Sequence, residues 1–94
     1  MTFLEHGDRR FRILAYHDAI RHDGPALEIA EVVDGEVGPE LMTVLFFPAD
    51  AGKAEVLLTS SSSLPLPIIM AFLKEAGREQ NRLEDASPER KPRT

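Results

Sequence analysis

The sequence contains no cysteine, so it can form no disulfide framework, no thiolate metal site and no thiol nucleophile. It also lacks the glycine-rich phosphate-binding patterns and the Gly-x-Ser-x-Gly motif of serine hydrolases. Its apolar runs are far shorter than the roughly 20 residues that span a bilayer, and its first ten residues lack the apolar core of a signal peptide. These absences predict a cytoplasmic protein without a membrane partner.

Basic residues are also fewer than acidic residues. The chain has 11 Lys and Arg residues against 16 Asp and Glu residues, for a net charge of −5. Nucleic acids are bound by positive surfaces, so this balance argues against a nucleic-acid partner. The basic cluster consists of Arg9, Arg10, Arg12 and Arg21, and acidic residues are interspersed among them. We therefore expect the local field around this cluster to be close to neutral.

The composition that is present is typical of one small globular domain. Hydrophobic residues make up 43% of the 94 residues and charged residues 29%. Residues 84–94 contain two prolines, mixed charges and no hydrophobic side chain larger than alanine. Such a segment cannot bury enough surface to order itself. The sequence therefore predicts a single domain over residues 1–83 and a disordered tail over 84–94.

The stretch from Leu41 to Phe47 is the most apolar in the chain and only Thr43 interrupts it, with Pro39 and Pro48 close to its two ends. A strand that is apolar on both faces usually has cover on both faces. We therefore expect a central strand, covered on one side by a helix of the same chain and on the other by something else.

Further strands are indicated before and after this stretch. Alternating residues favour strands over 10–20, 27–33 and 54–60, and short turn-rich segments separate all four strands. Short connections require antiparallel neighbours, which predicts a meander. Asp23-Gly24 is a strong hairpin signal, and a tight turn there would place Leu27 opposite Ile20. Residues 2–4 are compatible with a short edge strand, which the sequence leaves open.

One helix is expected, beginning near Leu66 after the serine run 60–63 and the prolines that suit a first helical turn. Its predicted apolar stripe contains Ile69, Met70, Leu73 and Ala76. The predicted fold is α+β: a four-stranded antiparallel meander with one C-terminal helix packed on one face. Either the sheet curls around the helix, or its other face is buried against another chain. The residues expected at such a partner interface are Met42, Val44, Phe46, Ala15 and Ala30.

Two polar groups near the first hairpin are candidates for chemistry. His17 and His22, with Asp18, carry metal-binding side chains, but their spacing of five along a strand and turn is poor for shared ligation. In the predicted register Tyr16, Asp18 and Glu31 would share a face, as general acids and bases or as a solvated fringe. We expect no cofactor. The favoured function is a non-enzymatic binding or accessory module that acts on a protein partner or on a second copy of itself. The alternative is a small ligand-binding or metal-binding domain or enzyme that uses the region of His17, His22, Asp18 and Tyr16.

Overall fold

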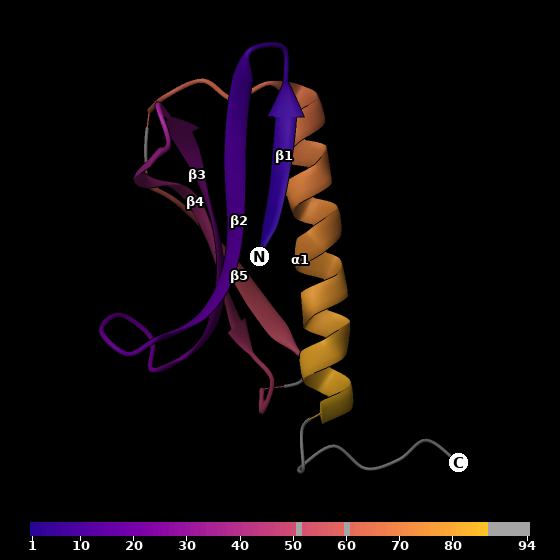
Figure 1. Cartoon of the computed structure of the whole chain (residues 1–94). Helices are drawn as coiled ribbons and strands as arrows, with labels where there is room; N and C mark the ends of the chain where they lie inside the picture. The colour runs from indigo at the N-terminus through magenta and orange to yellow at the C-terminus, as the bar shows by residue number, and fades with distance from the viewer. Residues whose placement is uncertain (51, 60, 87–94) are drawn as a thin grey trace.

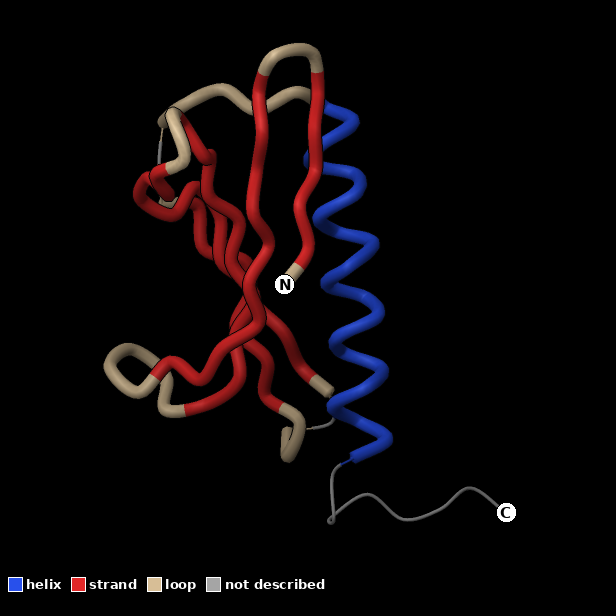
Figure 2. Tube along the Cα trace, in the orientation of Figure 1, coloured by secondary structure: helices blue, strands red, loops and turns tan. Residues whose placement is uncertain are grey.

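The computed structural model describes residues 1–50, 52–59 and 61–86, and shows one antiparallel sheet with one C-terminal helix (Figures 1 and 2). The elements are β1 (Thr2–His6), β2 (Arg9–Asp18), β3 (Gly24–Val33), β4 (Glu36–Phe47), β5 (Lys53–Leu58) and α1 (Leu66–Ala86). The strands follow one another across the sheet in chain order. The predicted α+β class and the antiparallel meander are confirmed.

The sheet has five strands rather than the four predicted. The additional strand, β1, forms a hairpin with β2, in which His6 lies opposite Arg9 and Thr2 lies opposite Ile13. Gly7 takes a positive φ of 62° in the two-residue turn, a conformation that glycine adopts without steric cost. β1 is half as long as β2, so the second half of β2 has no neighbour on that side within the described residues.

The β2–β3 register differs from the predicted one. Ala15, rather than Ile20, lies opposite Leu27, and the connection is a loop over residues 19–23. The reason is that the Asp18 carboxylate accepts hydrogen bonds from the backbone N–H groups of Ile20 and Arg21, at 3.1 and 2.9 Å, and so starts the turn early. The register therefore differs from the predicted one by five residues. Because five is an odd number, the side chains of β2 lie on the opposite face of the sheet from the one predicted relative to β3.

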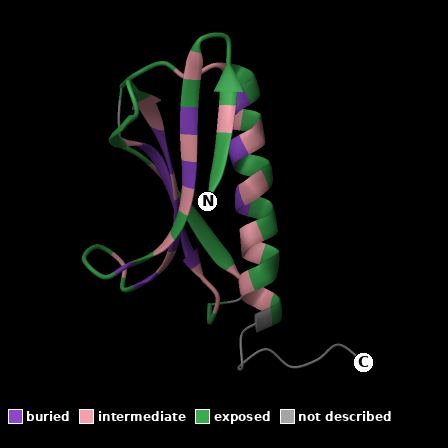
Figure 3. Ribbon diagram, viewed as in Figure 1, coloured by how far each residue is buried: buried purple, intermediate pink, exposed green. Residues whose placement is uncertain are grey.

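The stretch expected at the centre of the sheet lies in β4, between β3 and β5. Its residues from Leu41 to Phe46 are all buried. The main core lies between the sheet and α1, which covers one face (Figures 1 and 3). The buried residues of this core are Phe11, Ile13, Leu27, Ile29, Leu41, Met42, Val44 and Phe46 from the sheet, with Ile68, Phe72 and Ala76 from α1.

Helix α1 begins at Leu66, as predicted, but it buries a different stripe. Ile68, Phe72 and Ala76 follow the i, i+4, i+8 spacing of one helix face and lie in the core. Of the predicted stripe only Ala76 is buried, while Met70 and Leu73 are exposed. The helix also continues to Ala86, so the first residues assigned to the tail are helical, and the rest of the predicted tail, 87–94, lies outside the described residues.

Candidate functional site

The face of the sheet opposite α1 is covered by the chain's own polar side chains. Thr43 and Ala30 are fully buried there. Arg12 and Glu28 lie above them as an ion pair with an N–O distance of 3.4 Å, and their side chains are 19% and 18% exposed. Long side chains can cover apolar surface while keeping their charged ends hydrated. This covering accounts for the burial of Ala30 and Thr43 within a single chain.

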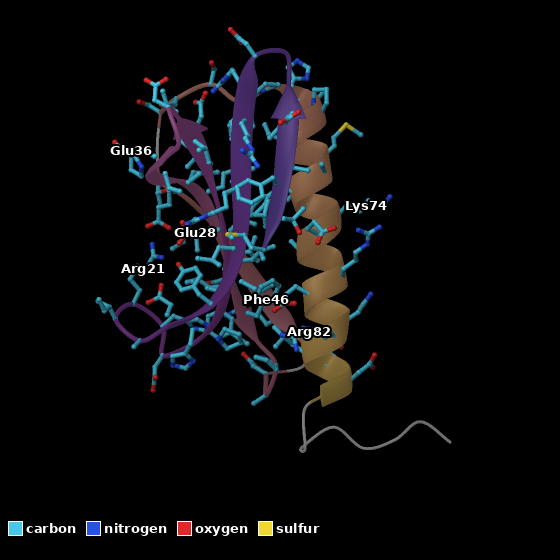
Figure 4. The ribbon with its side chains drawn as sticks, viewed as in Figure 1. Arg21, Glu28, Glu36, Phe46, Lys74 and Arg82 are labelled. Atoms are coloured by element: carbon cyan, nitrogen blue, oxygen red, sulfur yellow. The ribbon has the colours of Figure 1, made fainter. Side chains whose placement is uncertain are left out.

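Arg21 is the centre of a hydrogen-bond network on this face. Its guanidinium donates to Asp18 at 2.8 Å, to Glu40 at 3.1 Å and to the hydroxyl of Tyr16 at 3.0 Å. The backbone N–H of Arg21 and its side chain both hold the pKa of the Asp18 carboxyl below its usual range. The two carboxylates in turn raise the pKa of Arg21. The network therefore fastens the 19–23 loop to β4, and Figure 4 shows Arg21 on the side of the sheet away from α1.

Glu28 and Tyr16 titrate abnormally in the same region. Burial raises the pKa of Glu28, and the nearby Arg12 opposes that rise. Burial, assisted by the negative charge of Glu28, raises the pKa of Tyr16. The Nε of Arg12 is buried and makes no hydrogen bond within the part of the chain that the structure describes. These side chains therefore influence one another's ionisation on the face of the sheet away from α1.

The predicted metal-binding residues do not converge. The His17 Nε2 contacts the Asp23 carboxylate at 3.1 Å, the His22 ring contacts the carbonyl of Pro25 at 3.2 Å, and Asp18 is held by Arg21. Across residues 1–50, 52–59 and 61–86, no group of three or more metal-binding side chains is found. A shared metal site over His17, His22 and Asp18 is therefore not assembled.

The residues considered for acid–base chemistry do not lie together either. Tyr16 and Asp18 are linked through Arg21 on the face away from α1. Glu31 instead pairs with Arg9 at 2.9 Å, and Arg9 also donates to the carbonyl of Ser63 just before the helix. The separation follows from the β2–β3 register, which places Glu31 opposite Phe11 rather than opposite Tyr16.

The five residues predicted at a partner interface fall on different surfaces. Met42, Val44 and Phe46 lie in the core beneath α1. Ala30 is fully buried in the sheet. Ala15 is exposed and lines a hollow of about 230 Å³ between the sheet and the second half of α1. No single surface of the folded chain presents all five.

That hollow has an apolar floor and a charged rim. The floor includes Ile13 and Leu27, and the rim contains Arg78 and Arg82. Each arginine is paired with a glutamate three residues earlier on α1, so the rim carries no net charge from these four residues. Small-molecule pockets usually measure about 300–1,000 Å³. The hollow is smaller than this, and its two arginines are already paired, so neither is free to select a ligand.

A more extensive unpartnered surface begins on one flank of α1. Leu66, Met70 and Leu73 are 65%, 63% and 46% exposed. They are spaced by four and then three residues, the alternation of a helix–helix packing seam. Gln80 continues the same seam, and its side-chain amide donates to the carbonyl of Gly52, immediately before β5. This contact places the C-terminal half of α1 beside the start of β5.

The edge of the sheet formed by β5 is also open. Within the described residues, β5 pairs only with β4. The N–H of Thr59 donates to the carbonyl of Leu41 on β4 at 3.3 Å. Because backbone groups alternate in direction along a strand, those of Leu58, Val56 and Ala54 point away from β4. Val56 and Leu58 lie opposite Val44 and Met42, on the helix side of the sheet, and are 48% and 76% exposed.

We give the name β5–α1 surface to the exposed apolar side chains of these two elements, which are Val56, Leu58, Leu66, Met70 and Leu73. Proteins usually protect an edge strand with charges, prolines or bulges. The Lys53–Glu55 pair lies on the other side of β5, so the helix side of this edge carries no charged side chain from β5. The sequence pattern identified Met70 and Leu73 as apolar helix positions but placed them in the core.

Comparison with known proteins provides no relative from which a function could be carried over: no family model, curated protein or solved structure matches the chain. Among the residues that the structure describes, no helix has both the length and the apolar character needed to cross a bilayer.

Proposed function

We propose that this chain is a non-enzymatic protein-interaction module that binds its partner through the β5–α1 surface. The observation that carries the proposal is the open β5 edge with its exposed Val56 and Leu58, to which Leu66, Met70 and Leu73 of α1 add further exposed apolar side chains. An edge strand offers backbone hydrogen bonds to an added strand, and neighbouring apolar side chains supply affinity and selectivity. Exposed apolar patches of this kind mark interaction sites in water-soluble domains.

Order-of-magnitude energies indicate that a partner would use both the exposed apolar side chains and the backbone of the β5 edge. Fully burying one large apolar side chain contributes about 1.5–3 kcal/mol. The five side chains of the β5–α1 surface are 46–76% exposed, so covering them would contribute on the order of 5 kcal/mol. Association itself costs about 4–15 kcal/mol in lost freedom of motion. The side chains alone therefore offset at most the low end of this cost, and hydrogen bonds along the β5 edge would supply the further affinity.

The alternative function, a ligand-binding or metal-binding domain or enzyme built on His17, His22, Asp18 and Tyr16, has less support. Arg21 already satisfies Asp18 and Tyr16, and the two histidine rings contact different partners. Catalytic groups usually converge on a cavity in which a substrate can be enclosed. Asp18 and Tyr16 instead belong to the Arg21 network that holds the 19–23 loop.

Site-specific photocrosslinking tests the proposal. A photoreactive phenylalanine analogue is placed at Met70 in one version of the full chain and at Ile20 in another, and both are irradiated in cells that produce the chain. Ile20 is a matched control because it is apolar, is 94% exposed and lies in the 19–23 loop, outside the β5–α1 surface. The proposal predicts a discrete adduct from position 70 and none from position 20. Equal labelling at the two positions, or no adduct at position 70, would overturn it.

A further inference from the structure

We propose that the second half of β2 is a peptide-binding edge, where an extended segment of a partner protein continues the line of β1 and inserts one aromatic side chain into the hollow beside α1. This site goes beyond the proposed function. It lies on the β1–β2 side of the sheet, whereas β5 is the strand at the other side. It shares no residue with the β5–α1 surface.

The hairpin of β1 and β2 determines which backbone groups of β2 point away from β3. The two-residue turn makes His6 and Arg9 a hydrogen-bonded pair. Hydrogen-bonded pairs alternate along an antiparallel ladder, so the odd-numbered residues of β2 direct their N–H and C=O groups toward β1. Past the end of β1, the groups that point the same way belong to Ala15 and His17.

Pro25 is consistent with this alternation. It lies opposite His17 and, as a proline, has no N–H to donate. A proline in a sheet is placed where the ladder needs no hydrogen bond from it, which agrees with the His17 groups pointing away from β3. β1 ends at Thr2, opposite Ile13. The outward groups of Ala15 and His17 therefore have no strand partner within the described residues.

The hollow lies next to these outward groups. Ala15 and Leu27 line it on the sheet side, and Arg78 and Arg82 of α1 line it on the helix side. In Figure 1, β1 runs beside the first half of α1, and the N-terminus lies near the middle of the helix. A strand that continued the line of β1 would therefore lie between the second halves of β2 and α1, at the hollow.

The hollow favours one large, uncharged side chain. Opposed residues of antiparallel strands lie on the same face, so the peptide residue opposite Ala15 points into the hollow, which the small Ala15 side chain leaves unfilled. A cavity of about 150 Å³ accommodates a benzene ring, and the hollow measures about 230 Å³. Both arginines on its rim are paired with glutamates of α1, so the rim favours neither sign of charge. Guanidinium groups stack on aromatic rings, which favours an aromatic over an aliphatic side chain.

Segments of this chain do not meet these requirements. A second copy paired edge to edge along β2, with both outward residues used, would set His17 opposite Ala15. The His17 ring is already bound to Asp23 of its own chain. Residues 84–94 contain two prolines and no aromatic residue, so they lack both the ring and part of the N–H groups that the edge needs. The occupant is therefore a segment of a partner protein.

Amide hydrogen exchange of the full chain, measured by NMR, tests the proposal. The probe is a short synthetic peptide of threonine and valine with one central phenylalanine, and the control peptide has alanine in its place. In the free chain, the N–H groups of Ala15 and His17 should exchange at least tenfold faster than that of Tyr16, which points toward β3. The probe at millimolar concentration should slow exchange at Ala15 and His17 at least tenfold, and the control peptide should not.

A variant of the chain tests the role of the hollow. Ala15→Trp fills the hollow from β2 and should abolish the slowing at His17. Ile20→Trp, at an exposed position in the 19–23 loop, should retain it. Circular dichroism verifies that both variants are folded, and the wild-type exchange rates decide if Ala15→Trp is not.

Two results would overturn the proposal: no slowing at Ala15 and His17 with the phenylalanine probe, or equal slowing with the control peptide. Slowing confined to Val56 and its neighbours on β5 would also overturn it, while leaving the β5–α1 surface as the binding site. Absence of the position-70 photoadduct would instead reject the proposed function and leave the β2 edge unaffected. The failures of the two proposals are therefore distinguishable.

Discussion

Val56 on β5 lies directly opposite Val44 on β4, on the same face of the sheet, yet Val44 is 3% exposed and Val56 is 48% exposed. The difference arises because α1 covers the face as far as β4 and leaves the helix side of β5 open. An apolar sheet face is normally covered by another layer. A partner bound at the β5–α1 surface would supply the cover that β5 lacks.

The first prediction concerns the helix flank. Leu73→Glu should reduce the yield of the position-70 photoadduct at least tenfold, because it places a carboxylate among the apolar side chains that a bound partner would cover. The midpoint of thermal unfolding of the purified chain should change little, since exposed substitutions usually alter stability by about 0.5 kcal/mol or less. The yield of the position-70 adduct in cells measures the association. Ile20→Glu, at an exposed apolar position outside the surface, should leave it unchanged.

The second prediction separates the two apolar stripes of α1. Phe72 is fully buried against the sheet, whereas Met70 is 63% exposed. Phe72→Ala should lower the free energy of unfolding by about 3–5 kcal/mol through lost burial and a residual cavity. Met70→Ala should lower it by less than about 0.5 kcal/mol. Urea unfolding at low protein concentration measures both, and similar losses for the two variants would contradict the assignment of the buried stripe.

The third prediction is a pH dependence from Asp18. Because hydrogen bonds from Arg21 hold the pKa of this carboxyl below its unfolded value, the folded state favours the ionised form. Its contribution to stability is present above the unfolded pKa of about 3.9 and is lost as the pH falls through the lower folded pKa. Asp18→Asn should therefore give a shallower loss of unfolding free energy on acidification below about pH 4. Urea titrations at several pH values measure this slope, and an unchanged slope would contradict the role of Asp18.

The fourth prediction concerns metal ions. His17 and His22 contact Asp23 and the carbonyl of Pro25, and they do not share a site. Micromolar zinc or nickel should therefore cause no site-specific shifts of the histidine ring resonances in NMR spectra. Saturable shifts of both rings at equimolar metal would instead support the metal-binding alternative.

Much of the fold could be predicted from local patterns. The apolar run of β4, the short connections and the start of α1 at Leu66 all depend on residues close together in sequence. The sequence did not decide whether β1 forms, because Thr2–His6 is short and its apolar and polar residues alternate only weakly. The predicted β2–β3 register was wrong because it depends on the hydrogen bonds that the Asp18 side chain makes to the following backbone, which a turn dipeptide does not reveal.

The candidate site was harder to predict because it depends on which apolar residues the core leaves uncovered. α1 has two apolar stripes, and the sequence alone gives no reason to prefer the one that contains Phe72 over the one that contains Met70. Tertiary packing decides, and it leaves Met70 and Leu73 exposed to water. The predicted interface residue Val44 lies instead in the core.

The most direct test of the β5–α1 surface is photocrosslinking from position 70, compared in the same cells between the otherwise unchanged chain and the Leu73→Glu variant. Binding through this surface predicts a discrete adduct from the unchanged chain and a yield at least tenfold lower from the variant. An adduct of equal yield in both chains, or no adduct in either, would contradict binding through this surface.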